Sequence, residues 1–126
     1  MKRTIKQLTK YNISTVLSHY LFDTKTLEKI AERYKDNPVM WAGLCITQKL
    51  PESFMEKYAS RLNWGCVCEY QQMSDRFILK HIDKIEVERL VKNKHLKGKL
   101  LPSTVLALVS RYPEYKDKLL KLEGKK

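Results

Sequence analysis

Apolar residues in the middle of the chain recur every three or four positions. This spacing places side chains on one face of an α-helix, because a helix turns once in 3.6 residues. The clearest sets are Phe54, Tyr58 and Leu62; Phe77, His81 and Ile85; and Trp64, Val67, Cys68 and Gln71. Each set is short, so the pattern predicts helices of about two to three turns.

The same pattern occurs twice in neighbouring segments. Residues 41–54 read WAGLCITQKLPESF, and residues 64–77 read WGCVCEYQQMSDRF. The matching pairs, all at one constant separation, are Trp41 and Trp64, Leu44 and Val67, Cys45 and Cys68, Gln48 and Gln71, Leu50 and Met73, and Phe54 and Phe77. The same step relates Tyr58 to His81 and Leu62 to Ile85. These matches indicate an internal repeat with a period of about 23 residues.

Weaker copies flank this pair. An imperfect earlier copy runs over residues 26–40, where Asn37-Pro38 interrupts the register. A later copy begins at Leu101, after a step that is longer than the one between the first two copies. The extra residues fall in Lys97-Gly98-Lys99, which we expect to form a loop.

Helix-start residues stand where the repeat needs them. Pro is favoured in the first turn, Ser and Asn at the N-cap, and acidic residues near the positive end of the helix dipole. The residues concerned are Pro51 and Pro102, Ser74 and Asn63, and Glu52 and Asp75. Each copy is therefore predicted to fold as a short helical hairpin.

Short hairpins of this kind need neighbours. Isolated helices below about 12–15 residues are marginal in water, so stacked copies must cover one another's apolar faces. Trp41 and Trp64, at equivalent positions, are expected to supply the large contacts between copies. The predicted fold is all-α: stacked short helical hairpins, α-solenoid-like, in one compact domain. Within it, residues 1–37 form an N-terminal cap, 38–95 the repeat core, and 96–126 a C-terminal cap and basic tail.

Composition agrees with a single helical domain. The chain has 126 residues, 43% of them hydrophobic, which suffices for a core without disulfides or metals. Four Gly and four Pro are too few for a turn-rich all-β fold. No apolar run has the length of a membrane span, and no leader pattern opens the sequence. We therefore expect a cytoplasmic protein with reduced thiols and no membrane partner.

Net charge adds a functional clue. The chain carries a formal charge of +11, and its excess lies at the two ends: +4 over residues 1–22, zero over 23–72 and +7 over 73–126. Such a distribution favours a polyanionic partner: nucleic acid, an anionic membrane or an acidic protein face. The alternative interpretation is that the lysines only keep the protein soluble.

Two basic stretches are candidate polyanion-binding sites. The first, in RLVKNKHLKGK, comprises Arg89, Lys92, Lys94, His95, Lys97 and Lys99, and the second comprises Lys2, Arg3, Lys6 and Lys10. Since lysine outnumbers arginine in both, any nucleic-acid contact should be directed at phosphates and weakly sequence-specific. The basic tail after residue 115 is interpreted as a solvated, frayed terminus.

Catalytic and metal-binding patterns are absent from the sequence. Cys45, Cys66 and Cys68 show no C-x₂₋₄-C spacing, and two of them occupy equivalent positions on the apolar face, where free cysteine behaves as a small hydrophobe. His81 stands where the preceding copy has Tyr58, so it is expected to fill a packing slot. No acid–base pair is evident. We predict no catalytic residue, no metal site and no cofactor.

A known family of repeats resembles two segments of the chain, Trp41–Phe54 and Trp64–Phe77. Their shared pattern, W-x-x-[LV]-C-x-x-Q-x-[LM]-[PS]-[ED]-x-F, resembles short helical repeats of bacteriophage and large DNA virus proteins. The resemblance covers about residues 38–95 and implies viral origin and a small helical array. The chain departs from the common pattern at Pro51, where Ser is usual, and at Val87, where the aromatic is lost, which suggests that the array ends there.

These observations together predict a non-enzymatic binding protein. The first hypothesis is a stoichiometric protein–protein interaction with a host or viral macromolecule, in the host cytoplasm if the protein is viral. The alternative is a basic nucleic-acid-binding protein that uses the cluster at residues 89–99 and the N-terminal lysines.

Overall fold

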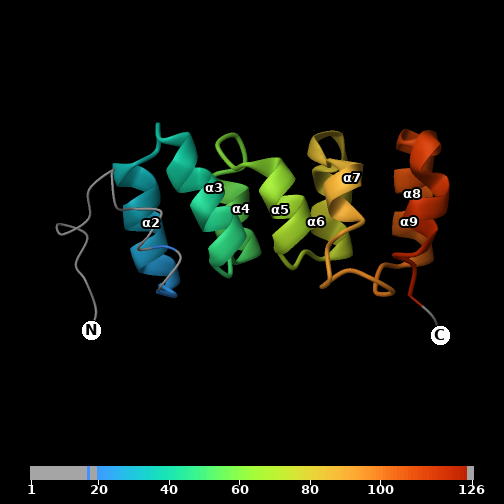
Figure 1. The fold of residues 1–126 in the computed structure, drawn as a ribbon, viewed down its shortest axis with the longest axis horizontal. Coiled ribbons are helices and arrows are strands. Elements are labelled where there is room, and N and C mark those ends of the chain that lie inside the picture. The colour runs from blue at the N-terminus through green and yellow to red at the C-terminus, as the bar shows by residue number, and fades with distance from the viewer. Residues whose placement is uncertain (1–16, 18–19, 125–126) are drawn as a thin grey trace. The chain divides into compact units, whose positions relative to one another are not determined.

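The computed structural model describes residue 17 and residues 20–124, and this part of the chain is all-helical, as predicted (Figure 1). These described residues contain eight α-helices, two short 3₁₀ helices and no strand. Contacts between Cα atoms divide the chain into two compact units, Met1–Asn63 and Trp64–Lys126. Each unit is described in turn.

The first unit contains α2 (Thr24–Arg33), α3 (Pro38–Thr47) and α4 (Glu52–Lys57). Helix α2 begins where the Asp23 carboxylate accepts a hydrogen bond of 2.8 Å from the amide of Thr26. Helix α3 begins where the Asn37 side chain accepts one of 2.9 Å from the amide of Val39. Asn37-Pro38, which interrupts the sequence pattern, is thus an N-cap followed by a first-turn proline.

Apolar side chains from all three helices form the core of this unit. The buried residues are Leu27, Ile30 and Ala31 from α2, Met40, Trp41, Leu44 and Cys45 from α3, and Phe54 and Met55 from α4. The buried side chain of Gln48 donates hydrogen bonds from Nε2 to the backbone oxygens of Tyr20 (2.6 Å) and Leu17 (3.0 Å). Its Oε1 accepts from the amide of Phe22 at 3.0 Å, so Gln48 holds the segment before α2 against the end of α3.

The second unit contains the remaining helices. They are α5 (Trp64–Tyr70), α6 (Asp75–Lys80), η2 (Ile82–Lys84), α7 (Val87–Leu90), α8 (Pro102–Arg111), η3 (Pro113–Tyr115) and α9 (Lys116–Leu120). Helix α5 packs against α7, and α8 packs against both α6 and α9.

Two predicted helix starts are confirmed, and a third is shifted. Ser74 caps α6 by accepting from the amide of Phe77 at 3.1 Å, and Pro102 opens α8. Pro51 was expected in the first turn of α4 but occupies the N-cap, immediately before the helix. Its extended backbone suits that position, because proline already fixes φ near the value that a helix entry needs.

An aromatic cluster of similar geometry occurs in each unit. The ring of Tyr58 lies 5.5 Å from that of Trp41 and 4.8 Å from that of Phe54. The ring of His81 lies 5.1 Å from that of Trp64 and 4.7 Å from that of Phe77. Tyr58 and His81 are 6% and 7% exposed, so His81 fills a packing slot as predicted.

The bounds of two helices follow the step of the sequence pattern. Glu52–Lys57 of α4 and Asp75–Lys80 of α6 have the same length, and the step that relates Phe54 to Phe77 also relates their first residues. Tyr58 and His81 are the C-cap residues, with closely similar backbone angles: φ of −110° in both and ψ of 23° and 29°. The same step also relates Trp64, the first residue of α5, to Val87, the first residue of α7, but α7 has only four residues.

The aromatic partners of the two indoles come from the helical pair to which each indole belongs, α3–α4 for Trp41 and α5–α6 for Trp64. The physical reason is that the pairs are short, so an indole early in the first helix reaches the aromatic C-cap of the second. The expectation that the indoles also form the large contacts between successive copies stays a prediction. Trp41 is 4% exposed and donates from Nε1 to the backbone oxygen of Lys35 at 2.8 Å, whereas Trp64 is half-buried.

Candidate functional site

The predicted basic cluster lies on the segment between α7 and α8, residues 91–101, which runs through consecutive turns. Asn93 and Leu96 point inward and are 1% and 2% exposed. Hydrogen bonds from the amide of His95 to Oδ1 of Asn93 (2.8 Å) and from the amide of Lys99 to the oxygen of Leu96 (3.0 Å) fix the turns. Gly98 takes a φ of 69°, a left-handed conformation that glycine adopts at little cost.

The side chains of the cluster between these anchors face outward. Lys92, Lys94, His95, Lys97 and Lys99 are all exposed. None of the four lysines forms an ion pair with a carboxylate in the described part of the chain. We call residues 92–99 the basic loop. Its backbone is held by buried residues while its charges remain available to a partner.

Arg89 does not belong to the basic loop. Its Nε lies 2.7 Å from Oε1 of Glu69, and its Nη2 lies 4.0 Å from Sγ of Cys66. The guanidinium therefore joins α7 to α5 inside the unit. Unlike the neighbouring lysines, Arg89 has a carboxylate partner, so its part in polyanion binding stays a prediction.

The second predicted basic set cannot be placed. Lys2, Arg3, Lys6 and Lys10 lie outside the described residues. They remain candidates on sequence grounds alone.

The C-terminal segment was interpreted as frayed, but it is ordered against the basic loop as far as Gly124. The amide of Leu100 donates to the oxygen of Leu122 at 2.8 Å, and the amide of Gly124 donates to the oxygen of Leu100 at 2.7 Å. Leu119 and Leu122 are 0% and 1% exposed and provide the apolar anchor.

The C-terminal segment adds further exposed lysines to the surface of the second unit. The amide of Gly98 donates to the backbone oxygen of Lys121 at 3.3 Å, so Lys121 directly adjoins the basic loop. Its side chain is exposed, as are those of Lys116 and Lys118 on α9. The mixture of leucines and lysines over residues 118–122 was the available sequence signal.

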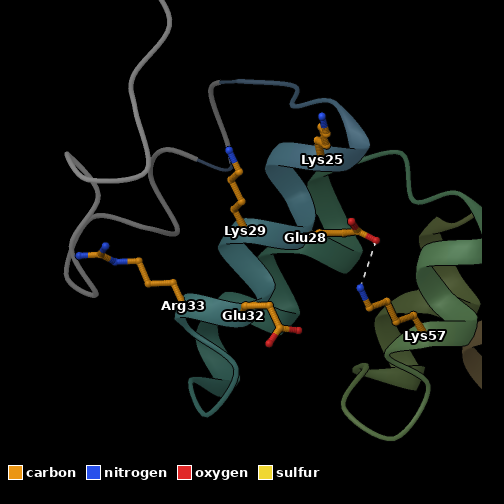
Figure 2. Close-up of a pocket in the computed structure, with 6 residues that line it drawn as sticks. All are labelled: Lys25, Glu28, Lys29, Glu32, Arg33 and Lys57. Atoms are coloured by element: carbon orange, nitrogen blue, oxygen red, sulfur yellow. Dashed lines mark ion pairs between the residues drawn. The ribbon is translucent and has the colours of Figure 1, made fainter.

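A second charged surface lies in the first unit, where α2 and α4 border an open depression (Figure 2). Its lining residues are Lys25, Glu28, Lys29, Glu32, Arg33 and Lys57. Both carboxylates have partners: Oε2 of Glu28 lies 3.5 Å from Nζ of Lys57, and Oε2 of Glu32 accepts from the Tyr58 hydroxyl at 2.6 Å. Burial, with the nearby Glu32, raises the pKa of Tyr58.

Three cations of this depression stay free of carboxylate partners within the described residues. They are Lys25, Lys29 and Arg33, all on α2 and all exposed. We call these three residues the α2 cations. The sequence did not reveal them because the surrounding segment is neutral overall, and charge counting does not distinguish paired from unpaired groups.

The three thiols are buried. Cys45, Cys66 and Cys68 form no disulfide in the part of the chain that the structure describes. Burial raises the pKa of Cys68 to about 11, although its Sγ accepts a hydrogen bond from the amide of Glu86 at 3.4 Å. Burial also raises the pKa of Cys66. Both are therefore protonated at neutral pH and are poor nucleophiles or metal ligands in that state.

Two further kinds of feature are absent from the part of the chain that the structure describes. No three His, Cys, Asp or Glu side chains of this part are grouped so that they could hold a metal ion. None of the helices described is long and apolar enough to cross a membrane.

Comparison with known proteins brings no relative to this site. No family model, no curated protein and no solved structure matches the chain.

Proposed function

We propose that the protein is a non-enzymatic binding module that holds an acidic segment of a protein partner in a stoichiometric complex. One observation carries the proposal: the helical pairs α3–α4 and α5–α6 share their aromatic geometry, and their second helices have matching bounds. Recurring helical pairs characterise proteins whose role is to present a surface.

We further propose that the pairs are units of an α-solenoid-like array. Equivalent buried positions, from Cys45 and Cys68 to Phe54 and Phe77, support this interpretation, because each pair uses the same positions to build its core. Resemblance of Trp41–Phe54 and Trp64–Phe77 to viral helical repeats supports a viral origin. A viral protein of this kind would act in the host cytoplasm, on a host or viral protein.

The depression beside α2 is the proposed contact surface. Its two carboxylates are engaged by Lys57 and Tyr58, so the surplus charge belongs to the α2 cations. Lys25, Lys29 and Arg33 project from one helix at every fourth position, which matches a partner segment lying along that helix. Charge complementarity of this kind mainly sets specificity and association rate.

Three described side chains of types often used in catalysis are buried in the core of the second unit. His81 packs between two aromatic rings, and the thiols of Cys66 and Cys68 have raised pKa values. These placements favour binding over chemistry as the function.

The proposal is tested by affinity capture from host-cell lysate after nuclease treatment, with stoichiometry measured on the purified complex. We compare the wild-type chain with the triple variant Lys25→Glu, Lys29→Glu, Arg33→Glu. A charge-matched control carries Lys49→Glu, Lys84→Glu and Arg111→Glu, at exposed positions elsewhere. The wild type and the control should retain the same acidic protein at near-equimolar amounts, and the triple variant should lose about 10-fold or more.

Two results would count against the proposal. If nuclease treatment removes all captured protein, the partner is not a protein. If the triple variant and the charge-matched control lose binding equally, the interaction depends on net charge rather than on the α2 cations.

A further inference from the structure

The basic loop and the C-terminal segment lie side by side in the second unit. Backbone hydrogen bonds join the C-terminal segment to Gly98 of the loop and to Leu100, the residue after it: Gly98 to Lys121 at 3.3 Å, Leu100 to Leu122 at 2.8 Å, and Gly124 to Leu100 at 2.7 Å. Segments on either side of α8, distant in the sequence, therefore contribute lysines to the same place.

From this arrangement we infer that the loop–tail surface, Lys92, Lys94, Lys97, Lys99 and Lys121, binds the phosphate backbone of nucleic acid. The loop–tail surface shares no residue with the α2 cations and belongs to the other unit. It would add a second binding activity to the protein.

The basic loop carries an uncompensated positive charge. Four lysines fall within residues 92–99, and that stretch contains no carboxylate. Two nearby carboxylates have partners within the unit: Glu88 accepts from the Tyr115 hydroxyl at 3.1 Å, and Asp75 accepts from the amide of Leu101 at 2.8 Å. Glu123, whose backbone pairs with Leu100, contributes one negative charge near Lys121, and the lysines leave the surface positive overall. The charge of the loop is thus available to an external anion.

The backbone of the loop is fixed before any ligand binds. Asn93, Leu96 and Leu100 are buried at 1%, 2% and 2% exposure, and they are interspersed with the lysines. Binding therefore does not have to order the loop, and that entropic cost is avoided. A lysine run that serves only solubility needs no such anchors.

The lysine side chains of the loop–tail surface indicate the chemical class of its ligand. Lysine ammonium groups act as point charges and lack the planar fork that reads base edges, so contact with phosphates is expected without base selection. Tyr112 and Tyr115, which lie just before α9, use their hydroxyls in bonds to Ile82 and Glu88. These two hydroxyls are thus held by bonds within the unit, and phosphate contacts are expected to dominate binding to both duplex and single strand.

The test uses the full chain and fluorescence anisotropy with a labelled duplex of about 25 base pairs and a labelled oligonucleotide of the same length, titrated at about 50 and 200 mM KCl. With about four phosphates contacted, affinity for the duplex should fall about 100-fold between the two salt concentrations. A change of duplex sequence should alter affinity less than about twofold.

Lysine-to-glutamine variants test which side chains form the nucleic-acid-binding surface. Changing Lys92, Lys94, Lys97 and Lys99 to Gln should weaken duplex binding at least about 10-fold at the lower salt concentration and flatten the salt dependence. Lys121→Gln alone should lower the log–log slope by about one. The charge-matched control changes Lys35, Lys49, Lys84 and Arg111 to Gln, all exposed, and should bind nearly as wild type. Circular dichroism melts establish that each variant is folded.

The inference is overturned if the wild type does not bind at the lower salt concentration, or if the quadruple variant and its control bind equally. It is also overturned if phosphatidylserine vesicles or polyglutamate compete as well as nucleic acid at the same charge concentration, since the surface would then be a general anion site. A negative result in these titrations does not bear on the proposed capture of a protein partner through the α2 cations. The two proposals are therefore judged separately.

Discussion

Asn93 donates a hydrogen bond from Nδ2 to the backbone oxygen of Cys68 over 2.8 Å, although the two residues are far apart in the sequence. The same nitrogen donates to the oxygen of Gln71, also at 2.8 Å. Both carbonyls lie at the C-terminal end of α5, where backbone oxygens lack helical partners. One buried side chain thus closes a helix and anchors the basic loop.

Asn93→Ala should destabilise the second unit by about 2–3 kcal/mol, because buried carbonyls would lose their donor. Chemical denaturation followed by circular dichroism measures the change. Lys94→Ala, at the adjacent exposed position, should alter the free energy of unfolding by less than about 0.5 kcal/mol. Equal effects of the two substitutions would show that the side-chain bonds of Asn93 contribute nothing.

Phe54→Ala and Phe77→Ala should have similar costs, about 3–5 kcal/mol each. The two rings are 1% and 2% exposed, and each packs against the aromatic C-cap of its own helix at 4.8 and 4.7 Å. Urea titrations followed by tryptophan fluorescence measure each variant. A large difference between the two costs would contradict the view that the helical pairs are equivalent.

Ionisation of Tyr58 should weaken the protein at alkaline pH. Burial and the hydrogen bond to Glu32 raise its pKa in the folded state above the ordinary value of 10.0. Folding therefore favours the neutral phenol of Tyr58. The stability that this preference contributes to the folded state is fully present below pH 10.0 and is lost as pH rises through the raised pKa. Ultraviolet difference titration should detect a late-ionising tyrosine in the wild type.

Glu32→Gln is the matched variant for this titration. Removing the carboxylate should lower the ionisation midpoint of Tyr58 toward that of an exposed tyrosine, since a negative neighbour no longer opposes the phenolate. An unchanged midpoint would assign the shift to burial alone.

Cys68 should be nearly inert toward thiol reagents in the folded protein. Its pKa of about 11 leaves little thiolate at mildly alkaline pH, and the side chain is 0% exposed. We expect alkylation by iodoacetamide at least about 100-fold slower than for free cysteine. Peptide mass spectrometry measures the rate, and urea-unfolded protein, in which all thiols should react readily, is the control. Rapid labelling of Cys68 in native protein would mean that α5 opens readily.

Local features were predictable from the sequence because they depend on residues within one turn of a helix. Ser74 beside the apolar run of α6 and Pro102 at the start of α8 act as their types suggest. The match of His81 to Tyr58 followed from the spacing alone, because the same backbone position in a similar helical pair meets the same neighbours.

Long-range pairings were not predictable from those rules. Bonds from Asn93 to α5, from Arg89 to Glu69, and from Leu100 to Leu122 each join residues that are distant in the sequence. Neither the hydrophobic periodicity nor the count of charges along the sequence specifies which distant residues will pair. These pairings separate Arg89 from the basic loop and add Lys121 to it, so the composition of the surface required the structure.

The hydrogen bond from Gly124 to Leu100 also determines where a fluorophore or an affinity tag can be attached without disturbing the loop–tail surface. Gly124 bonds to Leu100, next to Lys99, so a group attached within a few residues of Gly124 is tethered near the turn that holds Lys97 and Lys99. A bulky fluorophore or an acidic affinity tag at that end would shield those ammonium groups and suppress an interaction that the untagged molecule can make. A reporter on an engineered surface cysteine far from this turn avoids the artefact.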